Sequence, residues 1–395
     1  MGRTRWLTVL LVVLVAVSLT VTPVLAQEKS EEGESEGGIE GLIEGFIEAQ
    51  GTIGAVIILL GGIALLTACT EKLIDYLARA SFNMQISLFA LAIVFTGFEF
   101  DDTILALVLS AGELEGAALG TALGTGLAIT GITLAGAAIV RPFPVDLPID
   151  YLIIFALAPL ILVPFALLGT LTFIHGIILT AFFILAFAYF LLRERQRNVP
   201  VFRNTEFGQE LQEIRTDGGL ARPNSLKEIP EDRLLGNLAN SGIVWFILSI
   251  IALAGIVFAA MLLEGGSEVV IEGFGIDQTV FGATFLTLIL TFEDIMLTIE
   301  PVRRGFPEIG VGNVIGSVLF SVTGNVGVIM FLSEVTIAPS VLTFHLPAVI
   351  VVTAFAAYFL SEGYLKRWHG YLLGSLYVAY WLIAIFGFGG VPFGS

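Results

Sequence analysis

The feature that most constrains this chain is a series of apolar segments, each long enough to cross a lipid bilayer as a helix. About twenty consecutive apolar residues span the hydrocarbon core of a membrane. Five such segments precede a polar stretch and five follow it, at 52–70, 86–111, 117–140, 149–168, 171–192, 243–263, 278–299, 311–332, 341–360 and 371–388. Hydrophobic residues make up 56% of the 395 residues and charged residues 13%, which excludes a soluble domain of this length. The sequence therefore predicts an all-α integral membrane protein with ten transmembrane helices.

The amino terminus has the pattern of a secretory signal. Arg3 and Arg5 precede a short apolar run at 7–17 that ends in small residues, which predicts a signal peptide over residues 1–26. An uncleaved signal anchor is the alternative, although the run is short for a spanning helix. The acidic, glycine-rich segment 27–50 has too little apolar content to fold alone, and we expect it to be a solvated extracellular tail.

The positive charges predict an orientation, because Lys and Arg in short loops are retained in the cytoplasm. With the mature amino terminus outside, the polar stretch 193–240 becomes a cytoplasmic loop. The basic residues between helices fall on the same side: Lys72, Arg79, Arg141, Arg303, Arg304, Lys366 and Arg367. Each half, 51–192 and 241–390, then has five helices. Because five is an odd number, the second half starts on the opposite side of the membrane and is inverted relative to the first. The sequence thus predicts two inverted five-helix repeats in the cell membrane, as in many secondary transporters.

Cysteine usage and charge exclude further classes of protein. Cys69 is the only cysteine, so neither a disulfide framework nor a thiolate metal cluster forms within one chain. The net charge of −17 comes from few lysines beside many carboxylates, a balance typical of adaptation to high salt that says little about substrate. The loop 193–240 has no nucleotide fingerprint. We expect inorganic cations and the lipid bilayer as partners, no nucleic acid and no cofactor, and the oligomeric state stays open.

The two halves share a motif as well as a hydropathy pattern. Phe100-Asp101-Asp102 in the second segment corresponds to Phe292-Glu293-Asp294 in the seventh. In both halves, 19 residues separate the first acid from the first glycine of a small-residue motif, which begins at Gly120 or at Gly312. Two unrelated helix pairs would rarely match in both acids and spacing, so this match predicts an internal repeat.

Acidic side chains at mid-membrane depth point to a function. On insertion scales each costs about 2.5–3.5 kcal/mol, so several near the centres of two helices need a compensating use. Cation binding supplies one, and hard carboxylate oxygens suit Ca²⁺, Na⁺ or H⁺. We expect Asp101 and Glu293 to meet near the midplane as the principal ligands, with Asp102 and Asp294 assisting them. The alternative is that these carboxylates are paired with helix-packing hydroxyls.

Neutral oxygens near the acids are candidate additional ligands. Thr125, Ser317 and Ser321 carry hydroxyls, but membrane helices also use such groups to bond their own backbone. Glu99 lies beside the first acidic pair and is a candidate for the pathway, whereas Glu300 is expected at the interface. The glycine pairs of the two small-residue motifs would let helices approach closely, and packing alone would explain them.

The second repeat, over residues 280–327, resembles the alpha-repeat of the calcium/cation antiporter superfamily, which includes the sodium/calcium exchangers. That pattern runs from Gly-Thr-Ser-x-Pro-Glu to Gly-Asn-x-x-Gly-Ser-Asn, and here Glu293 takes the acid position while residues 312–317 match the second part. The resemblance implies Asn313 and Ser317 as further cation ligands. The first repeat matches more weakly, with Asp101 for the glutamate and Thr125 for the serine. A secondary active antiporter of ten helices is thereby implied.

Several family positions differ in this chain. Phe100 and Phe292 replace the proline before each acid, which removes the helix break expected there. Other positions where the family has neutral oxygen ligands hold Phe98, Leu290, Gly126, Val318 and Ile129. Sodium sites need several neutral oxygens, whereas protons need only carboxylates. We therefore expect exchange of Ca²⁺ or a related cation for H⁺ or Na⁺, with protons favoured as the coupling ion.

Rival interpretations differ in their sequence requirements. An intramembrane enzyme needs a nucleophile with a base or a motif such as His-Glu-x-x-His, and neither occurs, so the chain is not expected to be an enzyme. A channel or a transport-inactive protein would keep the exchanger fold, and the missing prolines favour that alternative. His175, His345 and His369 are expected to serve local packing or interfacial anchoring, with a proton relay as the alternative.

Overall fold

The computed structural model describes the main helical segments of the chain. The described ranges are 51–84, 86–97, 115–196, 230–274 and 287–388, together with isolated positions between them. The predicted signal peptide, nearly all of the predicted acidic tail, and the carboxylates Asp101 and Asp102 lie outside the described residues. The part of the chain from Ile47 onward forms one unit.

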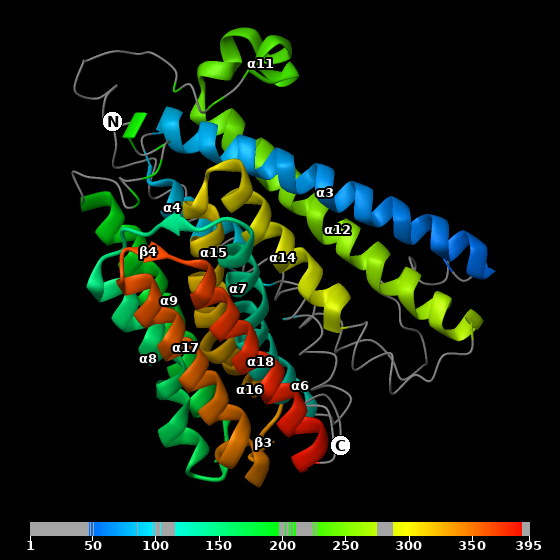
Figure 1. Ribbon diagram of the computed structural model, residues 1–395, viewed down its shortest axis with the longest axis vertical. Coiled ribbons are helices and arrows are strands. Elements are labelled where there is room, and N and C mark those ends of the chain that lie inside the picture. Colours follow the sequence, from blue (N-terminus) through cyan, green and yellow to red (C-terminus); the bar gives the residue numbers. More distant parts are fainter. Residues whose placement is uncertain are drawn as a thin grey trace. The chain divides into compact units, whose positions relative to one another are not determined.

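Helices make up nearly all of the described structure, as the long apolar segments predict (Figure 1). The first half contains α3 (Gly51–Met84), α4 (Leu88–Thr96), α6 (Glu115–Ala128), α7 (Ala135–Val140), α8 (Ile149–Ala166) and α9 (Phe173–Gln196). After α11 (Pro230–Leu235), the second half contains α12 (Gly242–Phe274), α14 (Thr287–Arg304), α15 (Pro307–Leu319), α16 (Val326–Leu332), α17 (Leu346–Ser361) and α18 (Arg367–Phe388). Among the described residues, seven helices are long and apolar enough to cross a membrane.

A π-helical turn interrupts one helix of each half at a corresponding place. The turn η1 (Ile129–Leu134) joins α6 to α7, and the turn η4 (Phe320–Asn325) joins α15 to α16. They begin nine residues after Gly120 and eight residues after Gly312, respectively. The repeat seen in the sequence therefore extends to the local backbone geometry.

Among the described residues, two short strand pairs join the halves. β1 (Phe143–Pro144) pairs antiparallel with β4 (Tyr364–Leu365), and β2 (Thr170–Leu171) pairs antiparallel with β3 (Val335–Thr336). β1 and β3 follow corresponding helices of the two halves, and so do β2 and β4. Each pair thus combines opposite members of the repeat, which is what a two-fold relation between the halves requires. In Figure 1, β3 and β4 lie at opposite ends of α17.

Two histidines occupy corresponding places in this arrangement. The backbone N–H of Thr172 donates to His175 Nδ1 at 3.0 Å, and that of Lys366 donates to His369 Nδ1 at 3.2 Å. Both histidines lie in the first turn of a helix, where backbone N–H groups near the end need partners. Phe165 packs on the ring of His175, and Phe359 stacks on that of His369. These contacts support the packing interpretation of both histidines.

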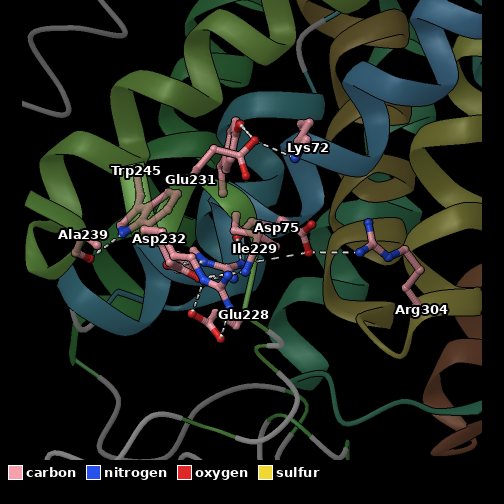
Figure 2. Close-up of polar contacts among 12 residues, drawn as sticks. Lys72, Asp75, Glu228, Ile229, Glu231, Asp232, Ala239, Trp245 and Arg304 are labelled. Carbon is pink, nitrogen blue, oxygen red and sulfur yellow. Dashed lines mark hydrogen bonds and ion pairs between the residues drawn. The ribbon is translucent and has the colours of Figure 1, made fainter. Parts of the chain in front are cut away.

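The polar segment between the halves makes specific contacts with the first helix. On α11, Glu231 accepts hydrogen bonds from Lys72 Nζ at 2.6 Å and from Tyr76 Oη at 3.0 Å (Figure 2). Arg79, which is almost fully buried, pairs with Asp232 at 3.1 Å and lies over the ring of Trp245. These contacts fix α11 at one end of α3, so this segment of the predicted loop is more than a linker.

The same end of the molecule carries contacts from other helices. Arg304, at the end of α14, pairs with Asp75 of α3 at 3.0 Å (Figure 2). Arg141, just before β1, donates to the backbone O of Arg303 at 2.6 Å. We call this end, which holds α11 and the pair β1–β4, the α11 face. The opposite end, where α16 leads into the pair β2–β3, is the β2–β3 face.

Candidate cation site

One continuous helix, α15 with η4 and α16, carries three of the described candidate ligands. All residues of α15 and of η4 are buried. Asn313, Ser317 and Ser321 follow one another at intervals of four residues, which places them on one side of the helix. The family-like motif Gly-Asn-x-x-Gly-Ser therefore forms a polar face inside the protein rather than on a lipid-facing surface.

Glycines of this motif bring the second helix of the first half into backbone contact. A Cβ atom built on Gly316 would lie 2.6 Å from the Cα atom of Gly97, and one on Gly312 would lie 2.7 Å from the Cβ atom of Ala92. No larger side chain fits at either position without a shift of the backbone. These contacts support the packing interpretation of Gly312 and Gly316, and they also set the position of the neighbouring hydroxyls.

The close approach of the two helices brings Glu99 next to the hydroxyls of the motif. The Ser321 Oγ atom donates to Glu99 Oε2 at 2.9 Å and also lies 2.7 Å from the backbone O of Ser317. Ser317 Oγ lies 3.4 Å from the backbone O of Thr96. Since Glu99 is only 7% exposed, a carboxylate from the first half is held inside the protein against a helix of the second half.

The amide of Asn313 makes the corresponding link within the second half. Its Nδ2 donates to Asp294 Oδ1 at 3.3 Å and to Thr298 Oγ1 at 3.1 Å, and both acceptors lie on α14. This assignment leaves Asn313 Oδ1 buried and without a hydrogen-bond partner. An uncommitted amide oxygen beside a carboxylate is a suitable ligand for a hard cation.

The remaining candidates are distributed as follows. Glu293 is half-buried on α14, directly before Asp294, and Thr125 is half-buried on α6. Glu300 forms an ion pair with Arg303 at 3.0 Å near the end of α14, as expected of an interfacial residue. Within the described part of the chain, no three His, Cys, Asp or Glu side chains come together as a metal cluster. Asp101, the other member of the principal predicted pair, lies outside the described residues.

Sequence reasoning missed three residues of the site. Thr298 lies one helical turn after Asp294, and Thr96 lies three residues before Glu99. Residues three or four apart are neighbours on a helix, so both could have been predicted from their spacing. Gly97 was not, because its contact with Gly316 joins helices more than 200 residues apart in the sequence.

Comparisons of the sequence with known proteins found a matching family model and two similar proteins. The model of the "Sodium/calcium exchanger protein" family matches residues 242–386. The chain is 30% identical over 138 residues to the sodium/calcium exchanger MaX1 of Methanosarcina acetivorans, a match that covers 35% of this chain and 39% of that exchanger. It is 26% identical over 280 residues to the inner membrane protein YrbG of Escherichia coli, covering 68% of this chain and 77% of YrbG.

A comparison of structures agrees with the sequences. The sodium–calcium exchanger NCX_Mj, solved after soaking in 2.5 mM Na⁺ and 0.1 mM Ca²⁺, superposes with a TM-score of 0.63 at 20% identity. The match covers 84% of this chain and 97% of NCX_Mj. It confirms the predicted fold class, an all-α membrane protein with the ten-helix inverted-repeat fold. The chain is a multi-pass membrane protein with the fold of NCX_Mj, and its residues 242–386 match the sodium/calcium exchanger family.

Proposed function

We propose that the chain is a secondary active cation antiporter that exchanges Ca²⁺ or a related cation for H⁺ or Na⁺. The observation that carries this proposal is the attachment of carboxylates from both halves to one buried helix. Ser321 holds Glu99 of the first half, and Asn313, eight residues earlier, holds Asp294 of the second half. A cation that moves along this helix between the two contacts would meet carboxylates of both repeats, which is the position that alternating access requires.

The proposed ligand set is the one predicted from the sequence. Asp101 and Glu293 are the principal carboxylates, and Asp102, Asp294 and Glu99 add negative charge. The neutral members are Thr125, Asn313, Ser317 and Ser321. Their chemistry is entirely that of hard oxygens, which suits Ca²⁺, Na⁺ and H⁺ and disfavours soft metals.

Exchange follows from competition for the same carboxylates. Several uncompensated acids within the bilayer are costly, so a site that is emptied of one cation favours rapid occupation by another. This would couple the two fluxes without a separate energy source. We propose H⁺ as the favoured coupling ion because the family positions now held by Phe98, Leu290 and Val318 supply no oxygen ligand for sodium.

One observation favours a second candidate, a channel or transport-inactive member of the family. Helix α14 runs without interruption from Thr287 to Arg304, through Phe292 and Glu293. The proline that would break the helix before this acid is absent, so the backbone carbonyls there stay within the helix. Such a protein would conduct cations down their gradient or not move them at all.

For orientation, we propose that the α11 face is cytoplasmic and the β2–β3 face extracellular. The basic residues Lys72, Arg141 and Arg304 all lie at the α11 face. We also retain the predicted division of the chain at residues 26, 50, 192 and 240 as a proposal.

The experiment that tests the coupling ion uses purified protein in proteoliposomes. Uptake of ⁴⁵Ca²⁺ is measured under an imposed pH gradient and, separately, under an imposed Na⁺ gradient. Uptake that follows the pH gradient supports H⁺ coupling. Uptake that follows sodium and ignores pH overturns the preference for H⁺ but leaves the antiporter proposal intact. Uptake that ignores both gradients favours the channel-like alternative.

A further inference from the structure

Asn325, the last residue of the π-helical turn η4, has a side-chain amide that takes no part in the contacts to Glu99 and Asp294. Its side chain is fully buried, and neither Nδ2 nor Oδ1 has a hydrogen-bond partner. Buried polar side chains are nearly always hydrogen bonded, so an amide with both ends uncommitted needs an explanation. π-helical turns occur frequently at functional sites, and Asn325 ends such a turn.

Asn325 continues the polar face that holds the candidate site. Asn313, Ser317, Ser321 and Asn325 follow one another at intervals of four residues, and all four are fully buried. Three such steps in an uninterrupted α-helix would rotate the last side chain by about 120° from the first. The last step, from Ser321 to Asn325, falls in the π-helical turn η4. A π-helix has more residues per turn than an α-helix, so these four residues make less than one full turn and reverse part of that rotation. The π-helical turn therefore keeps Asn325 on the face that carries Ser321.

The position of Asn325 along the helix places it on one side of the site. Ser321 contacts Glu99 and lies beside Gly126 of α6. Asn325 is one turn further toward the β2–β3 face. The corresponding residue of the first half is Thr133, whose hydroxyl donates to the backbone O of Ile129 at 2.6 Å. Of these two equivalent residues, Asn325 lies nearer the β2–β3 face. Its side-chain polar atoms have no hydrogen-bond partner, whereas the hydroxyl of Thr133 has one.

We propose that Asn325 Oδ1 is a ligand in an additional cation subsite between the Glu99–Ser321 contact and the β2–β3 face. This inference rests on the proposed function as a cation antiporter. The occupant is a hard cation, Ca²⁺ or Na⁺, because an amide oxygen is a neutral hard ligand. The Nδ2 group donates to a water molecule of the ion's hydration shell. A neutral ligand at this place lets a cation approach the carboxylates without binding so tightly that it fails to move on.

The test uses two substitutions at Asn325 and a matched control. Asn325→Leu removes both polar ends at similar size, and Asn325→Asp replaces the amide with a carboxylate. Thr353→Val is the control, because Thr353 on α17 is also fully buried with a hydroxyl that has no partner, yet it is not on the polar face. Thermal unfolding and size-exclusion chromatography of each variant in detergent check that it folds.

The readout is the concentration of Ca²⁺ or Na⁺ that gives half-maximal exchange, varied on one side at a time in vesicles of single orientation. For Asn325→Leu we expect this concentration to rise on the order of tenfold at the β2–β3 face, a size typical of a lost contribution to metal binding. For Asn325→Leu the half-maximal concentration at the α11 face should stay unchanged. For Thr353→Val the half-maximal concentrations at both faces should stay unchanged. Asn325→Asp lowers the Ca²⁺ value at the β2–β3 face. Folded Asn325→Leu protein with unchanged values at both faces, or with equal changes at both, overturns the subsite.

A binding measurement separates this subsite from the proposed function. The shift in thermal unfolding caused by CaCl₂ or NaCl is recorded for the natural protein and for Asn325→Leu. If the natural protein is stabilised by a cation but exchanges none, the antiporter proposal fails, and a weaker stabilisation of Asn325→Leu still supports the subsite. If Asn325→Leu is stabilised as strongly as the natural protein at every concentration, the subsite is wrong whatever the exchange result.

Discussion

The hydroxyl of Ser321 lies 2.9 Å from the carboxylate of Glu99, although 222 residues separate them in the sequence. Glu99 follows the short helix α4, and Ser321 lies in the π-helical turn η4. The contact exists because Gly97 and Gly316 allow their backbones to touch just before these residues. A packing feature of the repeat thus places a charged group of one half on a polar face of the other.

This contact predicts coupling between two substitutions. A hydrogen bond to a charged group contributes about 1.5–3 kcal/mol. Glu99→Gln and Ser321→Ala should therefore change the free energy of unfolding by amounts that do not add in the double variant. The measurement is a double-mutant cycle of unfolding in detergent. Additivity within about 0.5 kcal/mol would contradict the contact.

The close approach of the two glycines predicts a size limit. Gly316→Ala places a Cβ atom 2.6 Å from the Cα of Gly97, so backbone atoms must shift, at a cost of about 1–3 kcal/mol. The thermal unfolding temperature should fall, and exchange should fall with it because Ser321 is displaced from Glu99. Gly116→Ala is the control, since a Cβ atom there meets nothing within 4 Å. Equal unfolding temperatures for the two variants would show that the helices are not in contact.

The contact of α11 with α3 predicts a pH dependence. Burial favours the neutral acid, but hydrogen bonds from Lys72 and Tyr76 outweigh it and hold the pKa of Glu231 below its ordinary value of 4.5. A group with a lowered pKa stabilises the fold above its ordinary pKa, and this contribution is lost as the pH falls through the lowered value. Because the pair is partly exposed, the contribution is at most about 1 kcal/mol.

Glu231→Gln should remove that contribution at neutral pH and flatten the dependence of unfolding temperature on pH between neutral pH and the acid range. Arg233→Ala is the control, because Arg233 and Glu228 form an exposed pair. We expect no measurable loss of stability from that change. If the natural protein and Glu231→Gln lost stability in parallel on acidification, Glu231 would not contribute to the attachment of α11.

The predicted orientation can be tested by cysteine labelling. With Cys69 replaced by Ser, single cysteines at Asn240 and Lys366 should react with a membrane-impermeant reagent from the cytoplasmic side. A cysteine at Ser333, near the β2–β3 face, should react from the outside only. Labelling of Lys366→Cys and Ser333→Cys from the same side would contradict the inverted-repeat topology.

The architecture was predictable from the sequence because its signals are local. Apolar segments of spanning length, and equal spacing from Asp101 to Gly120 and from Glu293 to Gly312, can be recognised without knowledge of tertiary contacts. Corresponding residues such as His175 and His369 then occupy corresponding places in the structure. The repeat in the sequence thus extends to individual hydrogen bonds.

Tertiary contacts limited what the sequence could predict about the site. Gly316 matched a family motif, but its partner Gly97 belongs to a helix of the other half. The π-helical turns carry no composition that distinguishes them from the α-helices around them. Glu231 and Asp232 lie in the predicted cytoplasmic loop, and the sequence did not reveal their partners Lys72 and Arg79, which lie more than 150 residues away. Such pairings depend on how the helices pack, and helical periodicity alone does not contain that information.

The central claim is that carboxylates in the membrane couple the movement of two cations. The direct measurement loads proteoliposomes with ⁴⁵Ca²⁺ at equal concentration on both sides and then imposes a gradient of H⁺ or Na⁺. The account predicts that the natural protein accumulates Ca²⁺ above its starting concentration, and that folded Glu293→Gln protein does not. Ca²⁺ that never exceeds its starting concentration under either gradient, or full accumulation by Glu293→Gln, would contradict the account.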